Sequence, residues 1–122
     1  MGYKFKTFVD FFRYDIPYGI QNLFIYAKTI WLDRDWDYTY MFQLFAKKFE
    51  RMERLHRKYG CSANSTKYAD QLKVCKNLCQ RLADDEYWLT EHRDWQHADK
   101  LQRDDLEYLC QMVSKRSLRW WD

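Results

Sequence analysis

The 122-residue sequence predicts an all-α protein, an antiparallel bundle of four to five helices in a single domain over residues 1–122. The chain contains one Pro and three Gly, whereas these residues make up about 5% and 7% of an average protein. It therefore has few turn-forming residues for a many-stranded sheet. Apolar side chains recur at three and four positions along most of the chain, the period of an amphipathic helix. The length suits one hydrophobic core rather than two.

Three helices are predicted for the first half of the chain. Residues 4–14 form a short amphipathic helix that packs on the bundle. Pro17 fits the first turn of a second helix, which continues to about Trp31. A third helix runs from Asp37 until Gly60, and on its outer face acidic residues precede basic ones by four positions. We expect Gly60 to end this helix in the left-handed conformation.

Two further helices are predicted for the second half. Ser65 is the expected N-cap of a helix whose buried stripe reaches Tyr87 and which pairs antiparallel with the helix before it. Residues 90–100 lose the apolar pattern and predict a polar connection that carries His92 and His97 as exposed side chains. The last helix is expected to turn four side chains inward: Leu106, Leu109, Cys110 and Val113.

Charge and hydropathy exclude several classes of protein. The net charge of +3, from 21 basic and 18 acidic residues, is too balanced to indicate binding to extended nucleic acid. The first fifteen residues lack the uninterrupted apolar core of a signal peptide, so no secretion is expected. Residues 16–32 are apolar but too few to span a membrane, which predicts a core helix, with interfacial membrane contact as the alternative.

The four cysteines are expected to be reduced and buried as small apolar groups. Cys75 and Cys79 lie one helical turn apart, but the tight knuckle and second ligand pair of a structural zinc site are missing. The five-residue spacing of His92 and His97 does not suit a helical ligand pair. We therefore expect no bound metal.

No catalytic constellation is recognisable in the chain. The sequence has no phosphate loop, no glycine-flanked serine and no cysteine in an evident activated setting beside a histidine. These absences predict a protein without catalytic residues or cofactor, and therefore not an enzyme. An enzyme that uses the acidic runs 84–86 and 104–105 with a divalent ion remains as an alternative.

The segment Trp31–Tyr40 concentrates three carboxylates, one guanidinium and four aromatic rings. One interpretation is structural: Asp35 or Asp37 caps a helix that begins near Trp36, Arg34 pairs with the other carboxylate, and the two tryptophans seal the corner between helices. The other interpretation is that this charged corner forms the wall of a ligand pocket. The sequence leaves both open.

A cationic stripe is expected on the third helix, where basic residues repeat at i, i+4, i+7 and i+11 from Lys47 to Lys58. Guanidinium groups beside aromatic rings suit a phosphate-bearing base, which they pair with and stack on. Alternatively, Glu50, Glu53 and the acidic helix beyond neutralise the stripe. The predicted ligand-binding residues are Arg34, Trp36, Tyr38, Lys47, Arg51, Arg54, Arg119 and Trp120.

Much of the chain resembles a group of small, uncharacterised, all-helical accessory proteins of tailed bacteriophages. The resemblance covers residues 16–23 and 30–38, the helix that carries Lys48, Arg51 and Met52, and the closing residues 120–122. The Asp-Arg-Asp-Trp-Asp run at positions 33–37 is its most specific part. The resemblance carries no activity, but it implies expression in the cytoplasm of an infected bacterium. Small phage proteins of this size often bind a host protein or sequester a host nucleotide signal.

Two functions are therefore expected. The first is a non-catalytic protein that sequesters a nucleotide-derived host defence signal, of cyclic nucleotide or ADP-ribose type, and so inhibits antiviral immunity. Its arginines would meet phosphate, and Trp36, Tyr38 or Trp120 would stack on the base. The second is a protein–protein interaction module that inhibits a host protein through its Trp-rich surface. In both cases exposed aromatic surface predicts a homo-oligomer.

Overall fold

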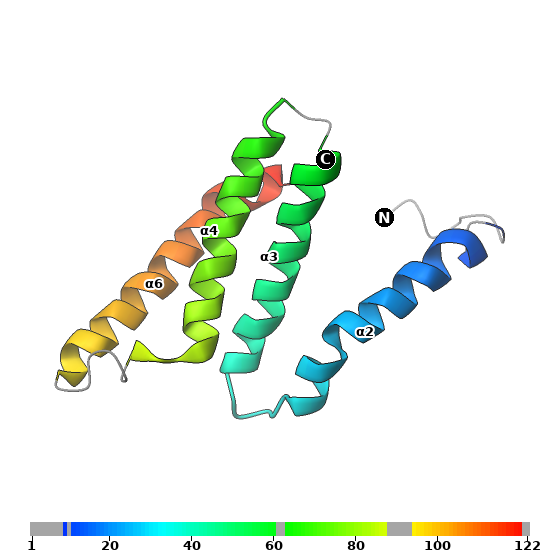
Figure 1. Ribbon diagram of the computed structural model, residues 1–122. Helices are drawn as coiled ribbons and strands as arrows, with labels where there is room; N and C mark the ends of the chain where they lie inside the picture. Colours follow the sequence, from blue (N-terminus) through cyan, green and yellow to red (C-terminus); the bar gives the residue numbers. More distant parts are fainter. Residues whose placement is uncertain (1–8, 10, 61–62, 88–93, 121–122) are drawn as a thin grey trace. The chain divides into compact units, whose positions relative to one another are not determined.

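The computed structural model describes residues 9, 11–60, 63–87 and 94–120, and within these ranges it contains helices and no strand. The predicted all-α bundle is confirmed. The elements in chain order are the π-helix η2 (Phe11–Asp15), the α-helices α2 (Ile16–Leu32), α3 (Thr39–Tyr59), α4 (Ser65–Asp84) and α6 (Trp95–Arg116), and the 3₁₀-helix η3 (Ser117–Arg119) (Figure 1).

Backbone contacts divide the chain into two compact units, Met1–Asp33 and Arg34–Asp122. The described part of the first unit is η2 followed directly by α2, with Pro17 in the first turn of α2 as predicted. The helix predicted over residues 4–14 lies largely outside the described residues. Its described end is the π-helical turn of η2. The single-domain assignment for residues 1–122 stays a prediction.

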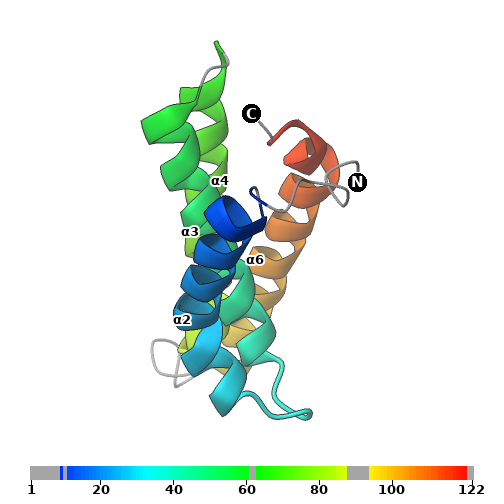
Figure 2. The ribbon, with the colours of Figure 1, turned by 90° about the vertical axis from the view of Figure 1, so that its right-hand side faces the viewer.

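In the second unit, α4 lies between α3 and α6 and packs against both (Figure 1). Successive helices run in opposite directions, which confirms the predicted antiparallel pairing of the third and fourth helices. Figure 2 shows the same three helices from the side, with η3 turning at the end of α6. Because α4 is central, it contributes more buried residues than either neighbour: Ser65, Ala69, Leu72, Cys75, Leu78, Cys79, Leu82 and Ala83.

The core of this unit forms where α4 meets its two neighbours. Phe42 and Ala46 enter from α3, and Ala98 and Leu109 enter from α6. Alanine and cysteine side chains at these positions allow the helix backbones to approach closely. The burial of Leu72, Leu82 and the two α4 cysteines is complete or nearly so, and each buried leucine stabilises the fold by about 1.5–3 kcal/mol.

The turn after α3 differs from its prediction in two ways. Gly60 ends α3 with φ of −62°, an extended conformation, so the predicted left-handed cap is wrong. Glycine is needed there for space, because a Cβ at this position would collide with the Ser65 side chain and the His56 carbonyl. Ser65 is the first residue of α4 rather than its N-cap, which is Asn64, and its side chain is buried.

The start of α6 also corrects the sequence analysis. The helix begins at Trp95, inside the segment expected to be a polar connection. The Asp94 carboxylate accepts a hydrogen bond from the His97 backbone N–H at 3.1 Å, the geometry of an N-cap. Polar residues in the first turn of a helix hid this start from a search for apolar periodicity. His97 is exposed as predicted, and His92 lies outside the described residues.

Candidate functional site

The acidic–aromatic segment joins α2 to α3, and α3 begins at Thr39, three residues later than the expected start near Trp36. The Asp37 carboxylate accepts hydrogen bonds from the Thr39 hydroxyl at 2.6 Å and the Thr39 backbone N–H at 3.0 Å. These bonds stabilise the ionised carboxylate and lower the pKa of Asp37. The N-cap residue of α3 is Tyr38, so neither Asp35 nor Asp37 occupies the predicted cap position, and Asp37 bonds to the first residue of α3 from one position earlier.

The tryptophans of this segment are exposed. Trp31 and Trp36 are 82% and 83% exposed, so the predicted burial of both indoles is wrong. Tyr38 has a role that the sequence did not indicate, because its hydroxyl accepts a hydrogen bond of 2.9 Å from Gln102 on α6. The same Gln102 amide donates to Asp85 at the end of α4. Tyr38 thus ties the start of α3 to the other two helices.

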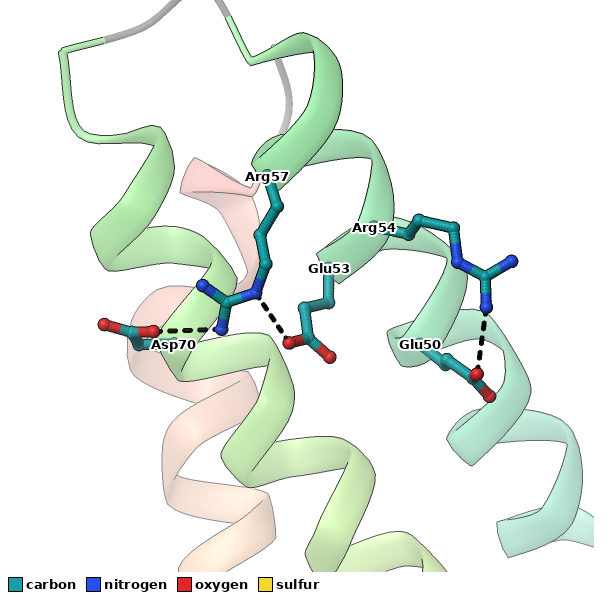
Figure 3. Close-up of polar contacts among 5 residues, drawn as sticks. All are labelled: Glu50, Glu53, Arg54, Arg57 and Asp70. Atoms are coloured by element: carbon teal, nitrogen blue, oxygen red, sulfur yellow. Dashed lines mark hydrogen bonds and ion pairs between the residues drawn. The ribbon is translucent and has the colours of Figure 1, made fainter.

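The predicted cationic stripe on α3 is partly neutralised. Arg54 forms an ion pair of 3.1 Å with Glu50, one turn away (Figure 3). Arg57 lies between Glu53 on its own helix, at 2.8 Å, and Asp70 on α4, at 3.0 Å. The hydrogen bonds that Arg57 donates to these two carboxylates raise its pKa above the ordinary value. The alternative interpretation, in which neighbouring carboxylates neutralise the stripe, is therefore confirmed for Arg54.

The C-terminal members of the predicted site have different environments. Arg119 is exposed in η3, whereas Trp120 is only 3% exposed. The Trp120 indole N–H donates to Gln71 at 2.9 Å, and its ring packs edge-to-face against Phe49. Trp120 is therefore a core residue, and its predicted stacking on a base is wrong because no ring face is open.

The eight predicted residues are thus spread over three parts of the second unit. Three precede α3 in the chain, three lie on α3, and two belong to the C-terminal turn. Lys47 and Arg51 on α3 are partly buried. Trp121 lies outside the described residues. Whether the exposed members bind a nucleotide stays a prediction.

An apolar groove between α3 and α6 is the feature that the sequence analysis missed. Its volume is about 410 Å³. No polar atom contributes surface to its walls. Phe42 and Leu109 form its buried floor and Phe49 is partly buried, while the other apolar lining residues are partly exposed. The full lining is Met41, Phe42, Phe45, Phe49, Leu106, Leu109, Cys110, Val113 and Ser114.

The groove contains all four α6 side chains that were expected to point inward. Leu109 is buried as predicted, but Leu106, Cys110 and Val113 are exposed. The physical reason is that α3 and α6 each pack mainly against α4, so the apolar residues that face away from α4 have no covering element within this unit. The apolar period correctly predicted which residues of α6 share a face, but it did not predict that most of them are exposed.

The described cysteines have two kinds of environment. Cys75 and Cys79 are buried free thiols, as predicted, and burial raises their pKa values to about 11 and about 12. Cys110 is a free, exposed thiol on the wall of the groove, so its predicted burial is wrong. Cys61 lies outside the described residues. Among the residues that are described, no group of three or more His, Cys, Asp or Glu side chains is arranged to hold a metal ion.

The acidic runs on α4 and α6 take part in a polar network at the end of α4. The Tyr87 hydroxyl donates to Asp105 at 2.5 Å, and Arg81 forms an ion pair of 2.8 Å with the same carboxylate oxygen. Burial and the neighbouring Asp105 raise the pKa of Tyr87 well above its ordinary value. A hollow of about 280 Å³ lies beside this network and is lined by Arg81, Asp84, Glu86, Tyr87 and Leu101. Since Asp105 is already engaged by two partners, the network acts as a clamp between α4 and α6.

Comparisons with protein-family models, with curated proteins and with solved structures find no match to this chain. Within the described ranges, none of the helices combines the length and the hydropathy needed to cross a bilayer.

Proposed function

We propose that this protein is an interaction module whose groove between α3 and α6 binds an amphipathic helix of a partner protein. The observation that carries the proposal is the open, wholly apolar groove. Exposed apolar surface is unfavourable in water by roughly 25 cal/mol per Å². A continuous exposed groove of this kind is typical of an interaction site.

The dimensions of the groove favour a helix as the occupant. Its lining on α3 runs from Met41 to Phe49, and on α6 from Leu106 to Ser114. Each wall is therefore about 12 Å long at ~1.5 Å per residue, or about two helical turns. A partner helix fills such a groove with anchors at i, i+3 or i+4, and i+7.

The polarity of the groove favours a peptide over a small polar ligand. Sites for nucleotides and other small molecules carry a few polar groups that orient the ligand. The walls of this groove supply none. The interaction surface we propose thus differs from the Trp-rich one expected from the sequence, in which Trp120 would have been an anchor.

The resemblance to phage accessory proteins leads us to propose a bacterial host protein as the partner, bound without catalysis. Sequestration of a nucleotide signal is the other candidate function, and its predicted cationic residues are Arg34, Lys47, Arg51, Arg54 and Arg119. Calorimetry against cyclic dinucleotides and ADP-ribose derivatives tests it. Heat of binding that disappears in Arg51→Ala would favour this function over the groove.

The groove is tested directly with a model peptide and a built-in reporter. The peptide is a helix with Leu at i, i+3, i+4 and i+7, and its control is an isomer whose leucines are scattered around the helix. Groove occupancy is followed by alkylation of Cys110 with N-ethylmaleimide, in a Cys61→Ser background. We expect the amphipathic peptide to slow alkylation of Cys110 and the isomer to leave it unchanged.

Two matched variants locate the binding. Leu106→Lys places a charge on the groove wall and should abolish peptide binding. Leu55→Lys makes the same change at an exposed position of α3 outside the groove and should retain binding. Equal binding by both variants, or by both peptides, would contradict the proposal.

A further inference from the structure

The α2 helix of the first unit carries a second apolar surface, which is independent of the groove. Its residues Ile16, Ile20, Leu23, Ala27 and Ile30 are spaced alternately four and three positions apart. This alternation is the a and d pattern of a coiled-coil seam. Phe24 and Trp31 follow the seam positions directly and widen the apolar stripe. We call these seven residues the α2 seam.

Most of the α2 seam is exposed, whereas Ile16 at its start is partly buried. Leu23 is 70% exposed and Phe24 is 80% exposed, and Trp31 is as open as Phe24. The buried residue of α2 is Thr29, which lies half a helical turn around from the centre of the seam. The buried position of α2 therefore lies away from the seam.

We infer that the α2 seam pairs with the α2 seam of a second copy of this chain, so that the protein is a homodimer. Helices with a repeating a and d pattern bury their seams against each other through knobs-into-holes packing. Only Lys28 is charged on α2, so no repulsion opposes the approach of two identical helices.

The area of the α2 seam is sufficient for a stable dimer. A buried aromatic side chain contributes about 150–250 Å². The two copies together bring four such rings, from Phe24 and Trp31, besides the aliphatic residues of both seams. This supplies most of the roughly 1,200 Å² at which specific interfaces begin.

The same residues argue against a membrane surface as the occupant. Helices that lie in the membrane interface are rich in Lys and Arg on their polar face, which anchors them to anionic headgroups. On α2 the corresponding side carries one basic residue, Lys28. A second copy, which needs no such charges, fits this helix better.

Sedimentation equilibrium of the full chain tests the inference. Wild type should sediment at twice the 15.3 kDa of one chain. Leu23→Lys, which places a charge in the seam, should be monomeric. Tyr18→Lys makes the same kind of change at an exposed position on the opposite face of α2 and should remain dimeric. Leu23→Ala keeps a strong helix former at the position, and should weaken the dimer by about tenfold or more while circular dichroism stays unchanged.

The groove variant separates this inference from the proposed function. Leu106→Lys should remain dimeric even though it no longer binds the model peptide. A wild-type protein that sediments as a monomer overturns the homodimer. This holds whether or not the protein also binds vesicles of phosphatidylcholine and phosphatidylglycerol in a flotation experiment. A Leu106→Lys protein that is monomeric like Leu23→Lys also overturns it, because α2 would then occupy the groove of the second copy.

Discussion

The two sides of the unit formed by α3, α4 and α6 carry the same kinds of apolar residue, but these residues are buried on one side and exposed on the other. On the α4 side, Leu72 and Leu82 are fully buried. On the groove side, Phe45 and Leu106 remain open although they follow the same helical period. The difference is whether a third helix covers them. An apolar period therefore identifies a face that requires burial, and the tertiary structure decides whether the chain itself supplies the cover.

Truncation of one leucine on each side should give the largest contrast. Leu72→Ala removes a fully buried side chain and should lower the free energy of unfolding by about 2–5 kcal/mol. Leu106→Ala removes a groove residue that is still partly solvated, and should lower it by less than about 1 kcal/mol. Urea denaturation measures both. Equal losses would show that the groove side is as well packed as the core.

Gly60→Ala should give the next largest effect, because the added Cβ meets the Ser65 side chain and the His56 carbonyl. The crowding should cost about 1–3 kcal/mol. Gly19→Ala is the control: nothing lies within 4 Å of its Cβ, and removing a glycine from the α2 helix should raise its helical stability by up to about 1 kcal/mol. Thermal unfolding measures the stability of both variants. A Gly60→Ala protein as stable as wild type would contradict the predicted crowding.

The thiols extend the comparison to alkaline pH. Burial raises the pKa values of Cys75 and Cys79 to about 11 and about 12, above the ordinary 9.0. The unfolded chain loses these protons from about pH 9 while the folded chain keeps them. Their contribution to stability is therefore complete below pH 9 and is lost as the pH rises towards 12.

Urea denaturation between pH 8 and pH 11 measures this loss. Cys79→Ala should flatten the decline in the free energy of unfolding relative to wild type. Cys110→Ala, which removes an exposed thiol on the groove side, is the matched control. A flattening by Cys110→Ala as large as that by Cys79→Ala would contradict the distinction between the two sides.

The smallest effect is expected on the outer face of α3. Arg54 and Glu50 form an ion pair between exposed side chains one turn apart. Such pairs contribute about 0.3–0.5 kcal/mol, and salt screens them. Arg54→Ala should therefore change the free energy of unfolding by no more than this, and the difference should vanish in concentrated salt. A larger loss would mean that the stripe takes part in packing.

The helices could be predicted from the sequence because they depend on local patterns. Pro17 marked the start of α2, and the period of apolar residues gave α3 and α4. Helix ends were less predictable. Asp94 precedes a helix whose first turn contains polar residues. Glycine is needed at position 60 because a Cβ there would meet the side chain of Ser65, five positions away. Such requirements exist only in three dimensions.

The candidate site could be predicted only in part, for a related reason. The sequence predicted a carboxylate, Asp35 or Asp37, at the start of α3, and the Asp37 side chain does bond to Thr39 there. It could not identify Trp120 as a core residue, because the partners of that ring are Gln71 on α4 and Phe49 on α3. It likewise could not separate Leu106 from Leu109, since only the position of α4 distinguishes them. The groove arises from this arrangement and has no local signature.

The reactivity of Cys110 in the folded protein tests the central claim most directly. In a Cys61→Ser background, the account predicts that N-ethylmaleimide modifies Cys110 at a rate close to that of a small free thiol, because Cys110 lies on the open wall of the groove. Cys75 and Cys79 should react only after denaturation, as mass spectrometry of the modified chain would show. If Cys110 were protected as fully as the two buried cysteines, the groove would be covered and its proposed role as a binding site would be contradicted.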